Sequence, residues 1–199
     1  SYDYCLNIGG ISNISFDHQG HRIAWDISPA NMLLNYYASE MNLLFDESGT
    51  IAESGTIHPI LLDQLNSIEY YHTEYPKSLG KEYVFKYFIP LIDHHDISIA
   101  DKLATICEHI SIEIARAVYS EQPKKVLATG GGAMNQFLIS RIRAHSVHEI
   151  VVPDKQLINF KEALIFAFLG VLRVEKTCNS LKEVTGAIQN SIGGAVYKG

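Results

Sequence analysis

The sequence predicts an α/β domain in which helices flank a mixed β-sheet. Two observations support this class. The first 28 residues contain three short strand-like runs separated by turn residues, and from residue 98 onward helical segments alternate with short apolar strands. A meander followed by such alternation is typical of a sheet covered by helices. The 199 residues, of which 47% are hydrophobic, are enough to bury a core.

An antiparallel meander is predicted at the start of the chain, over "YCLNI", "ISNISF" and "HRIAWDI". Gly9 and Gly10 join the first two runs. The segment "DHQG", which ends at Gly20, separates the second run from the third, and its residue types suit a hairpin turn.

Helical segments with short connections follow the meander. "SPANMLLNYYASEMNLLF" predicts a helix with Ser28 as the N-cap and Pro29 as the first helical residue. "GTIAESGTI" is predicted to be a loop, because it contains two glycines and small polar residues. After it we expect a short helix in "HPILLDQLN", a connector in "EYYHTEYPKSLG" and a helix in "KEYVFKYFIPLI".

The strongest helical signal begins at "SIAD", where Ser98 and Asp101 have the spacing of a capping box. Apolar residues then recur every three or four positions, as on one face of an amphipathic helix. The residues of this face are Ile99, Leu103, Ile106, Ile110, Ile114 and Val118. The helix is predicted to end before Pro123.

The last part of the chain alternates strands and helices. "KKVLATGGG" predicts a strand that runs into a turn, "AMNQFLISRIRAH" a helix, and "HEIVVP" another strand. "FKEALIFAFLGVLRVE" predicts a helix that is apolar nearly all round, so we expect it to be deeply buried. Together with the meander, this order fits a domain of the ribonuclease H type.

Composition excludes several classes of partner. The formal charge is −6 and there is no basic run, which argues against nucleic acid. The longest apolar run, residues 163–172, is about half of the roughly 20 residues that span a bilayer. The three cysteines form no CxxC pair, which favours a reducing, cytoplasmic location. The chain starts at Ser1 without a methionine, so we expect a fragment whose upstream part is missing.

Two glycine-rich segments raise the question of a ligand. "LATGGGAMN" lacks the GxGxxG spacing of a dinucleotide loop and the Gly-Lys-Ser/Thr of a P-loop. Two interpretations of the three glycines therefore remain. Either they form a strand-to-helix turn that needs positive φ, or they allow a ligand to approach the backbone closely. "LNIGGISN" could turn backbone N–H groups toward a phosphate, with Asn7, Ser12 and Asn13 as neutral donors. The cluster "DHHD" is read as a solvated loop, so no metal site is predicted.

Seven motifs in order carry a resemblance to a known family. They are "LNIGGISN", "WDISPANMLLN", "ESG", "KSLGKE", "TGGGAMN", "KEALIFAFLG" and "VTGA". Through essentially the whole chain, their order and spacing resemble the C-terminal half of anhydro-N-acetylmuramic acid kinases. That family is related to sugar kinases, actin and Hsp70 chaperones, whose two ribonuclease H-like lobes clamp ATP between them.

The resemblance implies an ATP-dependent kinase. Such enzymes use ATP, Mg²⁺ and water to open the 1,6-anhydro bridge of anhydro-N-acetylmuramic acid and phosphorylate O6, during cytoplasmic recycling of peptidoglycan amino sugars. This chain would be the single C-terminal lobe, residues 1–199, without the first phosphate loop, and inactive by itself. The resemblance also leaves room for a homodimer. A non-catalytic nucleotide-binding or interaction protein that retains the lobe is the alternative.

The resemblance assigns the catalytic base to Asp26, in the segment that the family writes FDTGPGN. Here Ile27, Ser28 and Ala30 replace the threonine and two glycines of that motif. The base is therefore retained while the loop differs. From the residue alone, an aspartate that only accepts backbone N–H bonds of a turn is the preferred interpretation.

The remaining site residues also follow from the resemblance. Gly9 and Gly10 match the second phosphate-binding turn, and the triglycine Gly130, Gly131 and Gly132 matches the turn that lies against adenosine, where Asn135 would add a polar contact. Glu162 matches a glutamate that binds the sugar, or is simply an acid favoured in a first helical turn. Lys77, Ser78 and Glu82 of "KSLGKE" receive no role.

Overall fold

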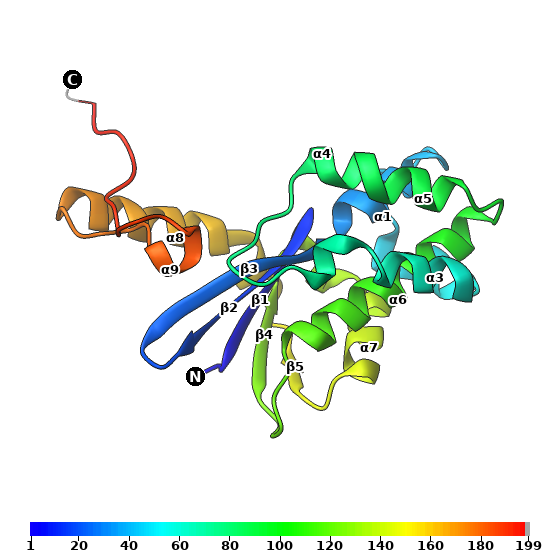
Figure 1. Cartoon of the computed structure of the whole chain (residues 1–199), viewed down its shortest axis with the longest axis horizontal. Helices are drawn as coiled ribbons and strands as arrows, with labels where there is room; N and C mark the ends of the chain where they lie inside the picture. Colours follow the sequence, from blue (N-terminus) through cyan, green and yellow to red (C-terminus); the bar gives the residue numbers. More distant parts are fainter. Residues whose placement is uncertain (198–199) are drawn as a thin grey trace.

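A five-stranded mixed sheet forms the centre of the computed structural model, which describes residues 1–197 (Figure 1). The strand order is β3-β2-β1-β4-β5. The antiparallel part consists of β1 (Tyr4–Ile8), β2 (Ile11–His18) and β3 (His21–Pro29). On the other side of β1, β4 (Lys125–Thr129) and β5 (Glu149–Val151) run parallel to it. The predicted meander and both later strands are therefore confirmed.

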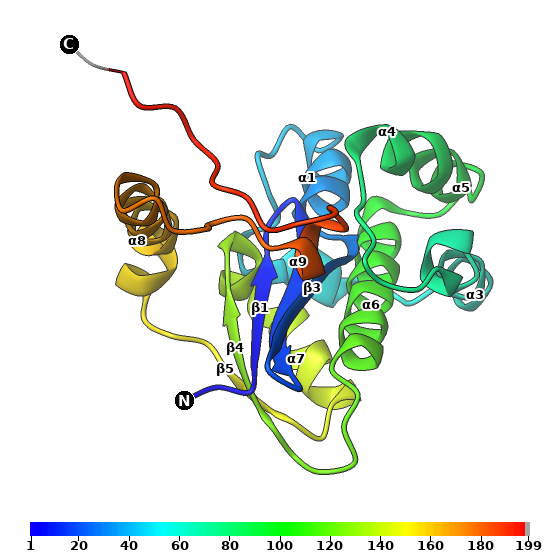
Figure 2. The ribbon, with the colours of Figure 1, turned by 60° about the vertical axis from the view of Figure 1, so that its left-hand side comes forward.

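The core lies between one face of this sheet and the long helix α6 (Ile99–Ala117). Leu6, Ile8 and Ile14 point from β1 and β2 into this layer and are fully buried. The predicted apolar face of α6 is buried as well, except for the partly buried Ile99 at its start. Because successive strand residues face opposite ways, this alternation fixes which face is covered. Figure 2 shows α3, α6 and α7 on one side of the sheet and α8 on the other.

Helix α6 starts where the capping spacing predicts. The Oγ of Ser98 accepts a hydrogen bond from the N–H of Asp101 at 3.1 Å, so one unpaired donor of the first turn is satisfied. The shorter helices are α1 (Asn31–Ser39), α2 (Thr50–Ser54), α3 (Pro59–Asn66), α4 (Lys81–Tyr83), α5 (Ile89–Asp93), α7 (Gln136–His145) and α9 (Lys182–Thr185). A π-helical turn, Val84–Phe88, joins α4 to α5.

The prediction that Ser28 and Pro29 open a helix is wrong. Both residues belong to β3, and α1 begins after Ala30. The hydroxyls of Ser28 and Ser12 hydrogen-bond to each other at 3.0 Å inside the core. Pro29 pairs with Ile11 at the last position of the ladder, where its missing N–H does little harm. Pairing across the sheet thus outweighs the local cap-and-proline signal.

The predicted loop "GTIAESGTI" contains the short helix α2, which corrects a second expectation. The signal lies just upstream of the segment: the carboxylate of Asp46 accepts hydrogen bonds from the N–H groups of Ile51 and Ala52, both at 2.9 Å. A carboxylate at the N-terminus of a helix satisfies unpaired N–H donors and interacts favourably with the positive end of the helix dipole.

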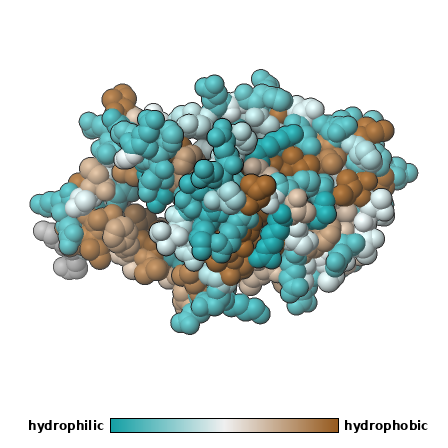
Figure 3. Space-filling view, turned by 90° about the horizontal axis from the view of Figure 1, so that it is seen from below, coloured by the Kyte–Doolittle hydropathy of each residue, from teal (hydrophilic) through white to brown (hydrophobic). Residues whose placement is uncertain are grey.

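The prediction that the apolar helix α8 (Lys155–Val174) is deeply buried is wrong. Leu164, Phe166 and Phe168 are 64%, 71% and 60% exposed. The helix runs away from the sheet in Figure 1, and Figure 3 shows brown side chains gathered over the end of the molecule where it lies. An apolar surface of this extent usually marks an interaction site. None of the helices within residues 1–197 combines the length and hydrophobicity that crossing a bilayer requires.

A buried carboxylate joins α6 to α7. Glu108 accepts two hydrogen bonds from Arg141, at 2.6 and 2.9 Å, and one from His145 at 2.7 Å. Burial raises the pKa of Glu108, but the hydrogen bonds and positive charges of Arg141 and His145 outweigh it, so that the pKa lies below its ordinary value. The ionised form is therefore the one that stabilises the fold.

We expect Glu108→Gln to lower the free energy of unfolding by about 2 kcal/mol at pH 7, because it removes a charge-assisted bidentate pair. The pKa of Glu108 is depressed on folding, so this contribution is present above its ordinary pKa of 4.5 and is lost as the pH falls through the lower folded value. Urea unfolding at pH 7 and pH 3.5 measures both effects. Glu121→Gln, at an exposed carboxylate, is the control; equal losses in the two variants would contradict the assignment.

Candidate functional site

Both glycine-rich turns lie at the same edge of the sheet. Strand β1 runs parallel to β4, and Asn7 pairs with Thr129 in the ladder. Gly9 directly follows β1, and Gly130 directly follows β4. The two turns therefore lie next to each other. The carboxyl ends of parallel strands are where open α/β sheets bind ligands.

Two of the three consecutive glycines are required by the fold itself. Gly130 has φ +86°, and a Cβ there would lie 2.6 Å from the carbonyl oxygen of Ile8. A Cβ at Gly132 would collide with the side chain of Ile8. Only glycine meets these requirements, because β1 and the turn after β4 pass so close to each other.

Gly131 has no such requirement. Its φ is not positive, and the nearest atom to a Cβ placed at this position would be Nδ2 of Asn31, at an ordinary 3.5 Å. Gly131 instead borders a cavity of about 710 Å³. The walls of this cavity come from α1, from residues 45–48, from the turn 131–136 and from residues 152–158. The middle glycine thus leaves a bare stretch of backbone facing an open cavity.

Asn135 lines the same cavity and caps a helix. Its Oδ1 accepts a hydrogen bond from the N–H of Leu138 at 2.9 Å, so α7 begins at Gln136. The predicted helix start at Ala133 is therefore wrong, since Gly131–Met134 form a 3₁₀ turn. Because Oδ1 serves the cap, a contact between Asn135 and a ligand falls to its NH₂ group.

Gly9 and Gly10 hold the start of α1 through their carbonyl groups. The oxygen of Gly9 accepts from the N–H of Asn31 at 3.1 Å, and that of Gly10 accepts from Ala30 and Met32 at 2.9 and 3.0 Å. Neither glycine has positive φ, and a Cβ at Gly9 or Gly10 would meet its nearest neighbours no closer than 3.4 Å. The fold thus does not require glycine at either position. Close contact with a ligand would explain why both residues are glycine.

The connector before α4 holds Asp26 in place. Oδ2 of Asp26 accepts a hydrogen bond from the N–H of Leu79 at 2.9 Å, and its carbonyl oxygen accepts one from the hydroxyl of Tyr70 at 2.5 Å. This backbone contact is the structural role that the residue type alone allows. Oδ1 has no hydrogen-bond partner among residues 1–197, so it can act on a ligand.

A β-bulge beside Asp26 sets the direction of its side chain. Asp26 pairs with Asn13 and Ser28 pairs with Ser12, which leaves Ile27 without a partner on β2. Trp25 and Ser28 are paired with the core-facing residues Ile14 and Ser12, whereas Asp26 points to the opposite face. Bulges commonly re-aim side chains in this way next to functional sites.

On the core-facing side of β3 lies a second cavity of about 440 Å³, lined among others by Trp25, Lys77, Glu113 and Arg116. Glu113 is buried and accepts from Arg116 at 2.6 Å, and its burial raises its pKa. This cavity is separate from the glycine turns. Asp26 does not line it.

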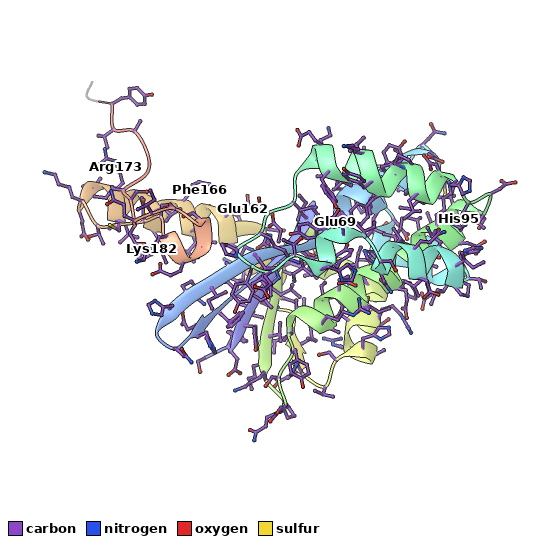
Figure 4. All side chains as sticks on the ribbon, in the orientation of Figure 1. Glu69, His95, Glu162, Phe166, Arg173 and Lys182 are labelled. Carbon is purple, nitrogen blue, oxygen red and sulfur yellow. The ribbon has the colours of Figure 1, made fainter. Side chains whose placement is uncertain are left out.

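Glu162 lies on α8 and is exposed; among residues 1–197 it forms no hydrogen bond or ion pair. In Figure 4, Glu162, Phe166 and Arg173 follow one another along α8, with Glu162 nearest the sheet. The structure does not bring Glu162 into contact with Asp26.

The residue that sequence reasoning missed is Lys161. Its ammonium group donates hydrogen bonds to Oδ1 of Asn7 and, at 2.8 Å, to Oγ1 of Thr129. Thr129 is the last residue of β4, directly before Gly130, and Asn7 is the penultimate residue of β1, separated from Gly9 by Ile8. The only signal in the sequence is a lysine directly before Glu162 in the largely apolar "FKEALIFAFLG".

Comparison with known proteins assigns the chain to a family. The family model for anhydro-N-acetylmuramic acid kinase matches residues 1–199. The chain belongs to the anhydro-N-acetylmuramic acid kinase family. It is 32% identical to the kinase of that name from Hydrogenovibrio crunogenus over 96% of this chain and 54% of that one. It is 34% identical to the Aliivibrio fischeri kinase over 99% of this chain and 56% of that one.

The chain thus spans just over half the length of the curated relatives it matches. These shares set no position within the relatives, so the expectation that it forms their C-terminal half stays a prediction. The family membership itself confirms the resemblance seen in the seven motifs.

Solved structures confirm the fold class. The activator of 2-hydroxyisocaproyl-CoA dehydratase from Clostridium difficile, with bound ADPNP, aligns with a TM-score of 0.52 at 18% identity over 88% of this chain and 63% of that one. Component A of (R)-2-hydroxyglutaryl-CoA dehydratase from Acidaminococcus fermentans gives 0.52 at 16% identity, over 82% and 59%. The lobe is therefore ribonuclease H-like, of the actin, hexokinase and Hsp70 type.

We expect Gly130→Ala to lower the free energy of unfolding by about 1–3 kcal/mol, because its Cβ would strain the backbone and meet Ile8. Gly131→Ala should change it by less than about 0.5 kcal/mol, since space and φ both allow a side chain. Urea unfolding of the two variants beside the wild type is the measurement. A similar loss in both would show that Gly131 also serves only chain geometry.

Proposed function

We propose that the complete protein is an ATP-dependent sugar kinase that opens the 1,6-anhydro bridge of anhydro-N-acetylmuramic acid and phosphorylates O6 during cytoplasmic peptidoglycan recycling. In this proposal, the present chain supplies the catalytic base and one wall of the nucleotide site. Membership of the kinase family supports the reaction class. The observation that carries the residue assignments is the bare Gly131 backbone at the cavity beside the carboxyl ends of β1 and β4.

The proposed nucleotide site consists of the two glycine turns and this cavity. Gly9 and Gly10 would face the phosphates, while Gly130, Gly131 and Gly132 would lie against the adenosine with the NH₂ group of Asn135 beside it. A structure of the same fold carries ADPNP, which supports a nucleotide in such a lobe. The cavity of about 710 Å³ is within the size range of small-molecule sites.

In the proposed reaction Asp26 acts as the general base. Its carboxylate takes a proton from a water molecule as the water oxygen bonds to the anomeric carbon. The bond from that carbon to the bridge oxygen breaks, this oxygen bonds to the γ-phosphorus of ATP, and ADP leaves. The free Oδ1 and the bulge that turns Asp26 away from the core support this role. Glu162 is proposed to bind the sugar.

Mg²⁺ would enter with the nucleotide and offset the negative charge that develops during phosphoryl transfer. Within the described residues no three His, Cys, Asp or Glu side chains come together as a metal cage. Nucleotide-bound Mg²⁺ usually takes only one or two protein carboxylates besides phosphate oxygens. The carboxylates that line the proposed nucleotide cavity are Asp46, Glu47 and Asp154, and nucleotide-bound Mg²⁺ would take its protein ligand from among them.

A second lobe would complete the cleft, and α8 supports its existence. The curated relatives are nearly twice as long as this chain, and Leu164, Phe166 and Phe168 form an exposed apolar surface on α8. We propose that the remaining part of the complete protein covers this surface and supplies the first phosphate loop. The lobe alone would then be inactive, because it offers only half of the phosphate contacts.

The alternative is a non-catalytic nucleotide-binding or interaction protein that retains the lobe. The observation in its favour is the altered segment after Asp26, where Ile27 is the bulged residue and Ser28 is buried against Ser12. A glycine-lined loop is replaced there by bulkier, inward-facing residues. Catalysis by the complete protein separates the two proposals.

We expect Asp26→Asn in the complete protein to reduce turnover by roughly 10²-fold or more, because the amide keeps the shape but cannot accept the proton. ATP affinity should persist. The measurement is ATP-dependent phosphorylation of the anhydrosugar, with ATP binding followed by calorimetric titration. Asp17→Asn, at an exposed residue of β2, is the matched control. Near-normal turnover of Asp26→Asn would show that another residue is the base and that Asp26 has only a structural role.

Gly131→Val should weaken ATP binding at least tenfold, because the new side chain enters the cavity that we assign to adenosine. The fold should persist, since the backbone at Gly131 accepts a side chain. ATP titration is compared with the wild type after circular dichroism has shown that the variant is folded. Gly193→Val, in the exposed C-terminal segment, is the control. Unchanged affinity in the folded Gly131→Val protein would place adenosine elsewhere.

A further inference from the structure

Lys161 lies where the two glycine turns meet. Its Nζ bridges β1 and β4 by donating to Asn7 and Thr129, which pair with each other in the parallel ladder. The side chain of Asn7 lies between the turns: its Nδ2 is the nearest atom to a Cβ placed at Gly9, at 3.4 Å, and its Oδ1 is 2.9 Å from a Cβ placed at Gly130. Asn7 therefore connects both turns to the lysine.

The hydrogen bonds around this ammonium group are directional. The hydroxyl of Thr129 donates to the carbonyl oxygen of Leu6 at 3.1 Å, so its oxygen presents a lone pair to Lys161. The bond from Lys161 to Oδ1 of Asn7 likewise orients the amide, with its NH₂ group toward Gly9. An ammonium group has three N–H donors, and these two partners leave the third for a ligand.

Lys161 forms no ion pair among residues 1–197. Both of its partners are neutral, and the lysines that form ion pairs within residues 1–197 are Lys102, Lys124 and Lys125. Lys161 is half-buried, and this burial lowers its pKa while the charge of Glu162 raises it. A partly buried cation without an anionic partner is costly, so a bound anion would stabilise it.

We propose that Lys161 is a nucleotide-binding residue that holds a phosphate group of ATP between the turns Gly9–Gly10 and Gly130–Gly132. The proposal rests on the proposed function and adds a cation to a site otherwise made of backbone and neutral donors. A lysine acts on phosphate as a point charge and needs no bidentate geometry. Through the same contact, phosphate binding would hold the N-terminal half of α8 against the ends of β1 and β4.

The test compares Lys161→Met with Lys161→Arg in the complete protein. Each variant is titrated with ATP and with adenosine, after thermal melting has shown that it is folded. We expect Lys161→Met to weaken ATP binding at least tenfold and adenosine binding less than twofold, because adenosine has no phosphate. Lys161→Arg should retain most of the ATP affinity. Lys182→Met, at a lysine on α9, is the matched control and should leave both affinities unchanged.

Equal weakening of ATP and adenosine by Lys161→Met would overturn the proposal and leave Lys161 as an anchor of α8. Unchanged ATP affinity in the folded variant would overturn it as well. Failure of the proposed function looks different, because the wild type itself would then bind neither ATP nor adenosine. A salt titration gives a second readout: ATP binding by the wild type should fall more steeply with ionic strength than binding by Lys161→Met.

Discussion

The parallel pairing of β1 with β4 is the contact on which the site depends. It joins residues near the start of the chain to residues far along it, with Asn7 opposite Thr129. Without this pairing, the diglycine and the triglycine would be two unrelated turns. With it, they share one edge, and the close passage of the chain past Ile8 explains why Gly130 and Gly132 carry no side chain. The site is therefore a consequence of strand order as much as of glycine content.

The same edge organises the helices that surround it. The carbonyl groups of Gly9 and Gly10 accept from the first N–H groups of α1, and Asn135 caps α7. Lys161 connects α8 to both strands. Backbone carbonyls and a side-chain amide thus hold the starts of α1 and α7, whereas α8, which Asp154 caps, is tied to this edge by the ammonium group of Lys161 farther along the helix. A ligand bound at this edge would contact the groups that position all three helices.

Local patterns in the sequence predict most of the fold, because strand alternation and helix caps act over a few residues. The meander, β4, β5 and the Ser98 cap belong to this class. The exposure of α8 does not, since an apolar composition shows that a helix needs a partner but not that the partner lies in the same chain. Likewise the contact from Leu79 to Asp26 uses a backbone N–H, which no residue type reveals.

The segment after Asp26 shows how a site can depart from its family motif and keep its main side chain in position. Ser28 is buried against Ser12, and its pairing there leaves Ile27 unpaired as a bulge. That bulge allows Ser28 to face the core while Asp26, two residues earlier, faces the other side. The substitutions therefore alter the path from β3 into α1, whereas the connector holds Asp26 separately: the N–H of Leu79 donates to its carboxylate and the hydroxyl of Tyr70 to its backbone carbonyl. Because the two supports are independent, the loop can change without moving the residue that we propose as the base.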